Sequence, residues 1–306
     1  MKLASLLMHL LGLLLLPFLL PGVINRVKAW WGGRRGAPFL QPLWDTRRLL
    51  GKQPVYSTVT TVVFRLAPLV VLATTLVAAL LAPMLPGGGL LPFPNDFVAF
   101  AYVLGLGRMF LTLAALDTGS PFEGMGAARE ATFSVFAEPA LFLVLGTLAL
   151  GSGHGTFAEL MRPHGWQAFL VTPLCVLALF LLLQIECARL PVDDPTTHLE
   201  LTMIHEVMIL DHSGPDLAMM QYAAALKLTL YAGVLAGLLN PIPLETQPVL
   251  AALVSLVLML ATAVAVGLLE SLLARLRMRL IPQFGMAIAV IGFVALVLAT
   301  TQPELG

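Results

Sequence analysis

The sequence predicts an all-α, polytopic integral membrane protein with about eight transmembrane helices. The first reason is composition: 58% of the 306 residues are hydrophobic and 11% are charged, whereas a soluble domain carries about 25% charged residues. The second is the recurrence of apolar segments of the length, about 20 residues, that a helix needs to cross a bilayer. The third is an uneven distribution of lysine and arginine between alternate loops. We expect a single membrane domain over residues 1–306.

Eight apolar segments are the candidates for membrane spans. They cover residues 3–25, 63–83, 97–116, 132–151, 168–188, 220–240, 248–271 and 283–301. The first follows Lys2, as the apolar part of a signal peptide would. Its apolar run is too long, and no small-x-small cleavage site follows before Asn25 and Arg26, so we expect a retained span.

The basic residues predict the orientation of the spans. Of the 17 lysines and arginines, 13 fall in or beside the loops 26–62, 117–131, 187–219 and 272–282, while the opposite side carries only Lys2 and Arg162. Cytoplasmic loops carry an excess of basic residues. The four basic loops are therefore expected on the cytoplasmic side and both termini on the non-cytoplasmic side.

Ionisable residues inside the spans are candidates for function, because a charge in the bilayer is costly. The candidates are Arg108, Glu138, Glu186 and Lys227. Each is also compatible with a satisfied internal ion pair. A row of acids whose pKa is raised by burial would make a proton relay. Glu270 ends the seventh span, and we expect it to be an interfacial acid paired with Arg275 or Arg277.

The loop 187–219 concentrates polar residues in an otherwise apolar chain. It contains Asp193, Asp194, His198, Glu200, His205, Glu206, Asp211, His212 and Asp216. Asp194-Pro195 is typical of a helix start, and Ser213-Gly214-Pro215 of its end. On such a helix the histidines recur every seven residues, about 10 Å apart, which is too far to share one metal ion without other ligands. Titrating histidines and a docking surface for a soluble partner both remain open.

Neither redox centres nor nucleic acid are indicated for this chain. Cys175 and Cys187 lie twelve residues apart and form no C-x-x-C pair, so we expect no iron–sulfur cluster and no metal site here. The formal net charge is zero, which gives no indication of a nucleic-acid partner.

Four stretches together resemble a known family. They are RRGAPFLQPLWDTRRLLGK (34–52), LDTGSPFEGMGAAREATFSVFAEP (116–139), IECARLPVDDPTTHLELT (185–202) and ESLLARLRMRLIPQF (270–284). Over essentially its whole length the chain resembles the membrane subunit 1 family of respiratory complex I. It is more similar to the corresponding subunit of membrane-bound group 4 nickel–iron hydrogenases, as in formate hydrogenlyase. The first stretch implies an amphipathic helix in the 26–62 loop.

The resemblance implies a subunit that carries no redox centre. Such a subunit anchors a peripheral redox module and couples its electron transfer to translocation of protons, or sodium ions, across the inner membrane of a prokaryote. The implied partners are a nickel–iron-hydrogenase-like large subunit, a small iron–sulfur subunit, a ferredoxin-like iron–sulfur subunit, antiporter-like membrane subunits and the lipid bilayer. The iron–sulfur clusters and any nickel–iron centre would then lie in partner subunits.

Position in these motifs, added to the ionisable residues above, gives two sets of candidates. Candidates for the coupling path are Arg108, Asp117, Glu130, Glu138, Glu186, Asp193, His198, Glu200, His205, Glu206 and Lys227. Candidates for the junction with the peripheral arm are Arg34, Arg35, Asp45, Arg129, Arg189 and Asp194. No catalytic residue is expected.

The chain also departs from the complex I pattern. Thr196 and His198 stand where that pattern has glutamates, which favours a complex that works without quinone and suggests His198 and His205 as proton-exchanging groups. One alternative is a quinone-site subunit of NADH:quinone oxidoreductase. Others are a free-standing secondary transporter, for which we see no paired halves, and a simple membrane anchor.

Overall fold

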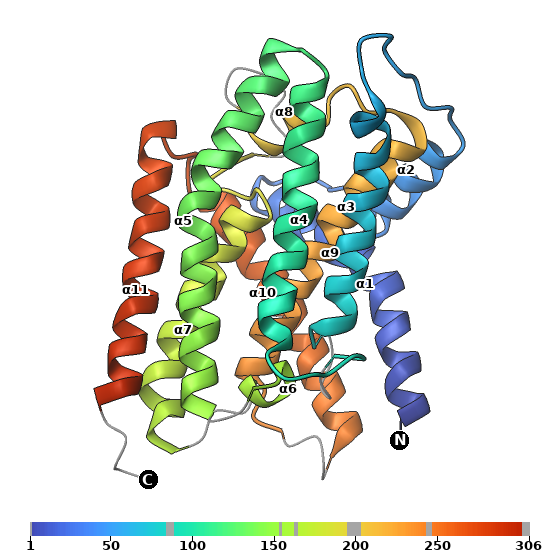
Figure 1. The fold of residues 1–306 in the computed structure, drawn as a ribbon. Coiled ribbons are helices and arrows are strands. Elements are labelled where there is room, and N and C mark those ends of the chain that lie inside the picture. Colours follow the sequence, from blue (N-terminus) through green and yellow to red (C-terminus); the bar gives the residue numbers. More distant parts are fainter. Residues whose placement is uncertain are drawn as a thin grey trace.

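A computed structural model describes residues 2–83, 89–152, 155–161, 165–194, 203–242 and 247–301. Its long helices stand side by side in one bundle, and α1 begins at the same end of the bundle at which α11 ends (Figure 1). Eight helices of the described part are long and apolar enough to cross a membrane, and this part contains no strand. The predicted all-α polytopic fold is confirmed.

Each predicted span overlaps one long helix. These helices are α1 (Lys2–Trp31), α3 (Val62–Leu81), α4 (Asp96–Asp117), α5 (Pro121–Ser152), α7 (Gly165–Glu186), α9 (Gly214–Leu239), α10 (Pro248–Leu272) and α11 (Ile281–Thr301). The shorter helices are α2 (Gln41–Leu50), α6 (Phe157–Leu160), α8 (His205–Met208) and the 3-10 helix η1 (Met278–Leu280). Helix α2 lies within the 26–62 loop, where the resemblance implied an amphipathic helix.

Helix α9 is the centre of the bundle and packs against α1, α3, α7 and α10. Its Tyr231, Leu235 and Leu226 are almost completely buried in the largest hydrophobic cluster. Small residues allow close approach elsewhere, as is usual between membrane helices. A Cβ on Gly107 of α4 would lie only 2.5 Å from Oγ1 of Thr74 on α3. Glycine at position 107 therefore sets the close packing of α3 on α4.

The segment 117–131 differs from the loop that the sequence predicts. Helix α5 begins at Pro121 and continues to Ser152, so residues 121–131 are helical and that part of the prediction is wrong. Proline suits the first turn of a helix because its missing N–H has no partner there. The consequence is that Glu130 and Glu138 stand on one continuous helix. The side of the membrane that this segment occupies stays a prediction.

The helix predicted to run from Asp194 towards His212 is also wrong for the residues that the structure describes. Residues 195–202, with His198 and Glu200, lie outside the described residues. Met203 and Ile204 are not helical, and α8 is a single turn. Oδ2 of Asp193 accepts the backbone N–H groups of Ile204 and His205, each at 3.0 Å. These bonds tie the chain to Asp193 at the point where the predicted helix would continue.

Candidate functional site

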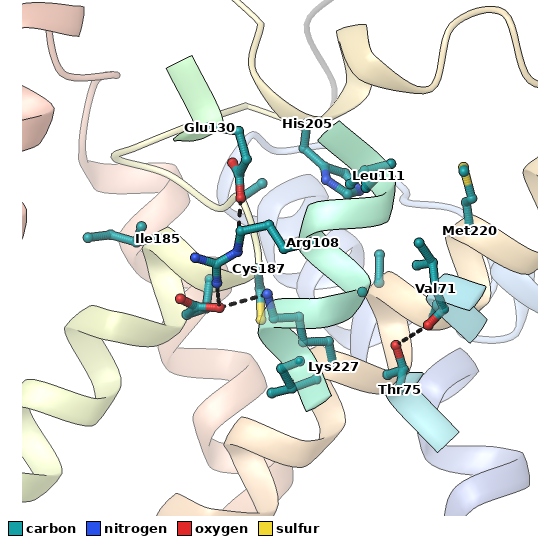
Figure 2. A pocket seen from close by; sticks show the side chains of 16 residues that line it. Val71, Thr75, Arg108, Leu111, Glu130, Ile185, Cys187, His205, Met220 and Lys227 are labelled. Atoms are coloured by element: carbon teal, nitrogen blue, oxygen red, sulfur yellow. Dashed lines mark hydrogen bonds and ion pairs between the residues drawn. The ribbon is translucent and has the colours of Figure 1, made fainter. Parts of the chain in front are cut away.

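Arg108 on α4 contacts carboxylates from two other helices in the interior of the bundle (Figure 2). Its Nη2 pairs with Oε2 of Glu186 at the end of α7. Its Nη1 lies 3.2 Å from Oε1 of Glu138, and its Nε lies 3.4 Å from Oε1 of Glu130, both on α5. One guanidinium thus joins α4, α5 and α7. The internal ion pair, which the sequence left open as one of two possibilities for Arg108, is present.

Lys227 on α9 completes the cluster. Its Nζ lies 2.7 Å from Oε2 of Glu186, the same oxygen that Arg108 contacts, and the Glu186 side chain is 1% exposed. A buried carboxylate between two cations is compensated in charge. Counted together, Arg108 and Lys227 face three carboxylates, those of Glu130, Glu138 and Glu186. The cluster thus contains two cations and three carboxylates, and Glu186 is the carboxylate that both cations contact.

A small cavity of about 60 Å³ lies against this cluster, and we call it the central cavity. Its lining includes Arg108, Glu130, Glu186, Lys227 and His205. Figure 2 shows His205 on the same side of Arg108 as Glu130, with Lys227 on the opposite side. The charged groups among the mostly apolar lining residues, and the volume, suit a few water molecules. Water there would connect the charged groups for proton transfer.

Two larger cavities adjoin the central cavity. The lateral cavity, of about 380 Å³, shares Arg108 and Glu186 with it and extends to Glu138 and Tyr102 at the side of the bundle. The loop-side cavity, of about 260 Å³, shares Cys187 and His205 with it. The three cavities therefore form a row. His205 and Cys187 lie between the loop-side and central cavities. Arg108 and Glu186 lie between the central and lateral cavities.

The loop-side cavity holds titratable groups from α2 and α8. Burial lowers the pKa of His205 to about 4, Lys227 lowers it further and Asp193 opposes the change. The imidazole is therefore neutral at pH 7 and has one nitrogen to accept a proton and one to donate it. Burial raises the pKa of Glu206 to about 7, the nearby Asp193 raises it too, and Arg189 opposes them. Glu206 thus changes its charge near neutral pH.

Asp193, a predicted path residue, has a structural role at the edge of this cavity. Its side chain is 1% exposed, and Oδ1 lies 2.9 Å from Nη2 of Arg275. Its other oxygen holds Ile204 and His205 as described above. Asp193 thus positions His205 at the wall between the loop-side and central cavities.

Glu270 does not have the partners that the sequence suggested. It lies 2.8 Å from Nζ of Lys28 on α1 and 3.5 Å from Nη1 of Arg189. The expected pairing with Arg275 or Arg277 is wrong. Residues 273–277, directly after α10, are not helical, and the N–H of Leu276 donates to the carbonyl of Pro191. This course carries Arg275 to Asp193 instead.

Other predicted residues lie outside the cluster. Asp117 accepts hydrogen bonds from the N–H groups of Thr61 and Phe64 and so caps α3. Arg129 donates to the carbonyl of Met203 at 2.8 Å. The junction candidates Arg34 and Arg35 are exposed, Asp45 lines the loop-side cavity and Asp194 donates its N–H to Asp193.

Sequence reasoning missed two residues. Cys187 lines both the central and the loop-side cavities, but a cysteine outside a motif gives no signal in a sequence. Glu123 is 1% exposed, and its Oε1 accepts the N–H of Asp211 at 3.0 Å. It lies in the segment 117–131 that the sequence predicts as a loop, and no local sequence pattern indicates that its side chain is buried. Among the described residues no group of three or more histidine, cysteine, aspartate and glutamate side chains is arranged to hold a metal ion.

Comparison with known protein families identifies the family of this chain. The family model for NADH dehydrogenase matches residues 4–301. The chain belongs to the NADH dehydrogenase family. The resemblance of the four sequence stretches to this family is thereby confirmed. The family member described here is thus a membrane subunit of the complex I-like type. The eight apolar helices of its described part, together with the Escherichia coli relatives below, indicate a multi-pass protein of a prokaryotic inner membrane.

Two relatives from Escherichia coli (strain K12) are similar over most of their length. Hydrogenase-4 component C is 34% identical over 282 residues, which cover 88% of this chain and 87% of the relative. Formate hydrogenlyase subunit 4 is 30% identical over 296 residues, which cover 92% of this chain and 94% of the relative. A solved chain of the membrane-bound sulfane sulfur reductase, an archaeal respiratory membrane complex, has a TM-score of 0.77 at 21% identity, covering 98% of this chain and 99% of that one. This last likeness shows the shared fold.

Proposed function

We propose that this chain is the membrane-arm subunit of a complex I-like, group 4 hydrogenase. It anchors a peripheral nickel–iron and iron–sulfur module and couples electron transfer there to translocation of protons, or sodium ions. The charged cluster of Arg108, Glu186 and Lys227 between the central and lateral cavities carries this proposal. The similarity to subunits of hydrogenase-4 and formate hydrogenlyase supports the hydrogenase assignment. The redox centres lie in the partner subunits.

The row of cavities supports a route for protons through the chain. Glu206 takes up a proton near neutral pH in the loop-side cavity. The neutral imidazole of His205 passes a proton through the wall to the central cavity. The cluster holds it, because Arg108 and Lys227 leave one of the three carboxylates uncompensated. Glu138 then delivers it to the side of the bundle.

Glu138 supports an antiporter-like membrane subunit as the next partner along this route. Its side chain is 49% exposed half-way along α5. Pro139 has no N–H, so the carbonyl of Val135 on the same helix lacks its helical donor. Ionised carboxylates and free carbonyls are not stable against lipid chains. A membrane subunit that covers this face keeps both the Glu138 carboxylate and the Val135 carbonyl away from the lipid chains, and it can accept the proton.

The basic loops at the opposite end of the route support docking of the soluble subunits there. Arg34 and Arg35 are exposed, and Arg129 and Arg189 hold the segments next to α8 through Met203 and Glu270. We infer that the large nickel–iron subunit, the small iron–sulfur subunit and the ferredoxin-like subunit contact this end, and that it faces the cytoplasm. Both termini then lie on the other side.

A quinone-site subunit is the second candidate. It would need a pocket for quinone, and the loop-side cavity is where such a pocket would lie. Its volume of about 260 Å³ is below the roughly 300–1,000 Å³ of most small-ligand pockets. Its lining also carries the charged groups Asp45, Arg189, Asp193 and Glu206. Both properties are unfavourable for an apolar quinone. Quinone-site inhibitors should therefore leave the activity of the complex unchanged.

The assignment is tested by purifying the complex in mild detergent through a tag on this chain. Mass spectrometry identifies the subunits that co-purify, and hydrogen evolution from a reduced low-potential donor is assayed on the same sample. We expect nickel–iron, iron–sulfur and antiporter-like subunits together with hydrogen evolution. Recovery of NADH-oxidising subunits with quinone reduction would contradict the proposal.

A further inference from the structure

Helix α2 has two faces of different character. Pro42, Asp45 and Thr46 point to the loop-side cavity. Trp44, Arg47 and Arg48 are exposed, and their spacing of three and four residues places them together on the other face. The Trp44 side chain is therefore an aromatic group beside two guanidinium groups, and the Arg47 guanidinium carbon lies 6.0 Å from the centre of the Trp44 ring.

Contacts of α2 place it beside the membrane-spanning helices and not on top of them. Across the loop-side cavity it faces Phe18 of α1 and Tyr222 of α9. A Cβ on Gly22 of α1 would lie 1.8 Å from the carbonyl oxygen of Phe39, so the chain before α2 is pressed against α1 there. Helix α1 continues from Gly22 to Trp31, a rise of about 14 Å. Helix α2 lies at the edge of the bundle, beside the upper part of α3 in the view of Figure 1.

The charge around α2 is strongly positive. Residues 26–65 contain Arg26, Lys28, Arg34, Arg35, Arg47, Arg48, Lys52 and Arg65, which is eight of the 17 basic residues, and a single acid, Asp45. Leu40 and Leu50 are exposed near the two ends of the helix. A short helix beside the membrane-spanning helices, with exposed tryptophan, leucine and arginine, has the character of helices that lie in the interface of anionic membranes.

We propose that the outer face of α2 binds the phosphate group of an anionic phospholipid through Arg47 and Arg48, with the Trp44 ring at headgroup level. Guanidinium groups bind phosphate with parallel, charge-assisted hydrogen bonds, and tryptophan is enriched at this depth of a membrane. Arg48 also pairs with Asp45 at 2.9 Å, and its side chain is still 71% exposed. A soluble subunit fits less well, because α2 lies beside the spans. The inference goes beyond the proposed function and does not depend on which redox reaction the complex performs.

The test places the photoreactive residue benzoylphenylalanine at position 44 in the assembled complex. The complex is reconstituted in nanodiscs of phosphatidylcholine with a minor share of phosphatidylglycerol, illuminated, and its adducts are identified by mass. We expect adducts with phospholipid in which phosphatidylglycerol is enriched roughly fivefold over its share of the bilayer. In the R47Q/R48Q variant the enrichment should disappear.

The matched control is the R277Q/R279Q variant, which removes two exposed arginines from another basic loop and should leave the enrichment unchanged. All four arginines are exposed, so neither variant should disturb folding. Adducts with a partner polypeptide would overturn the inference and make α2 a subunit interface. Lipid adducts in proportion to the bilayer composition would overturn it as well.

Discussion

Nζ of Lys227 lies 2.7 Å from Oε2 of Glu186, and Arg108 contacts the same oxygen from the other side. The pair joins α9 to α7 at the wall between the central and lateral cavities. Removing one partner of a buried ion pair leaves an uncompensated charge and costs about 3–5 kcal/mol. The pair thus determines both the stability of this part of the bundle and the charge available for proton uptake.

Lys227→Met should therefore destabilise the complex by about 3 kcal/mol, because Glu186 keeps only one cationic partner. The double variant Lys227→Met/Glu186→Gln should recover much of that loss, because no buried carboxylate then lacks its second cation. Thermal unfolding of Lys227→Met, Glu186→Gln and the double variant gives the coupling energy. Additive losses in the double variant would show that the two side chains do not interact.

Glu206 predicts a dependence of stability on pH. Its pKa is raised from 4.5 to about 7, so between these values the folded protein binds more protons than the unfolded protein does. The stability that protonated Glu206 contributes is therefore fully present below about pH 4.5 and is lost as the pH rises towards 7. Glu206→Gln should flatten this part of the profile and raise the unfolding temperature above pH 7. Equal profiles for the two proteins would contradict the raised pKa.

Gly107 predicts the effect of adding one methyl group between α3 and α4. Gly107→Ala brings a Cβ to 2.5 Å from Thr74 Oγ1, and overpacking of this kind costs about 1–3 kcal/mol. Gly146 is the matched control, since a Cβ there meets no atom of the described structure within 4 Å. Gly146→Ala should leave the unfolding temperature unchanged or raise it slightly. Similar effects of the two substitutions would contradict the close contact.

Replacing Asp193 should increase the local mobility of the backbone at the start of α8. Asp193→Ala removes the acceptor of the Ile204 and His205 amides and the partner of Arg275. Hydrogen exchange of these two amides should become faster while exchange in the core of α9 stays the same. Asp211→Asn changes an exposed acid and serves as the control. Unchanged exchange at positions 204 and 205 would show that Asp193 does not hold this segment.

The sequence was sufficient for the spans, because eight apolar runs of membrane length need no knowledge of packing. It was also sufficient to single out Arg108, Glu138, Glu186 and Lys227, because charge is rare in such runs. That Glu130 and Glu138 both meet Arg108 depends on α5 being helical from Pro121. Local composition gave no sign of that, because GSPFEG is rich in residues typical of loops.

The predictions that were wrong concern positions where contacts between distant segments determine the structure. Glu270 was assigned to arginines close in sequence, but α1 brings Lys28 to it from a distant part of the chain. The predicted helix through Met203 gave way to hydrogen bonds from Ile204 and His205 to Asp193. In each case a contact between segments outweighed the local propensity, which amounts to less than about 1 kcal/mol for an ordinary residue.

The most direct test of the coupling route is the Glu138→Gln variant of the assembled complex in sealed membrane vesicles. Proton uptake and hydrogen evolution are measured together, with Asp211→Asn as the control, since Asp211 lines none of the three cavities. The proposed route leaves the chain through Glu138, which lines the lateral cavity, so we predict that hydrogen evolution continues while proton uptake per hydrogen molecule falls to near zero. An unchanged ratio of protons to hydrogen in Glu138→Gln would contradict the account.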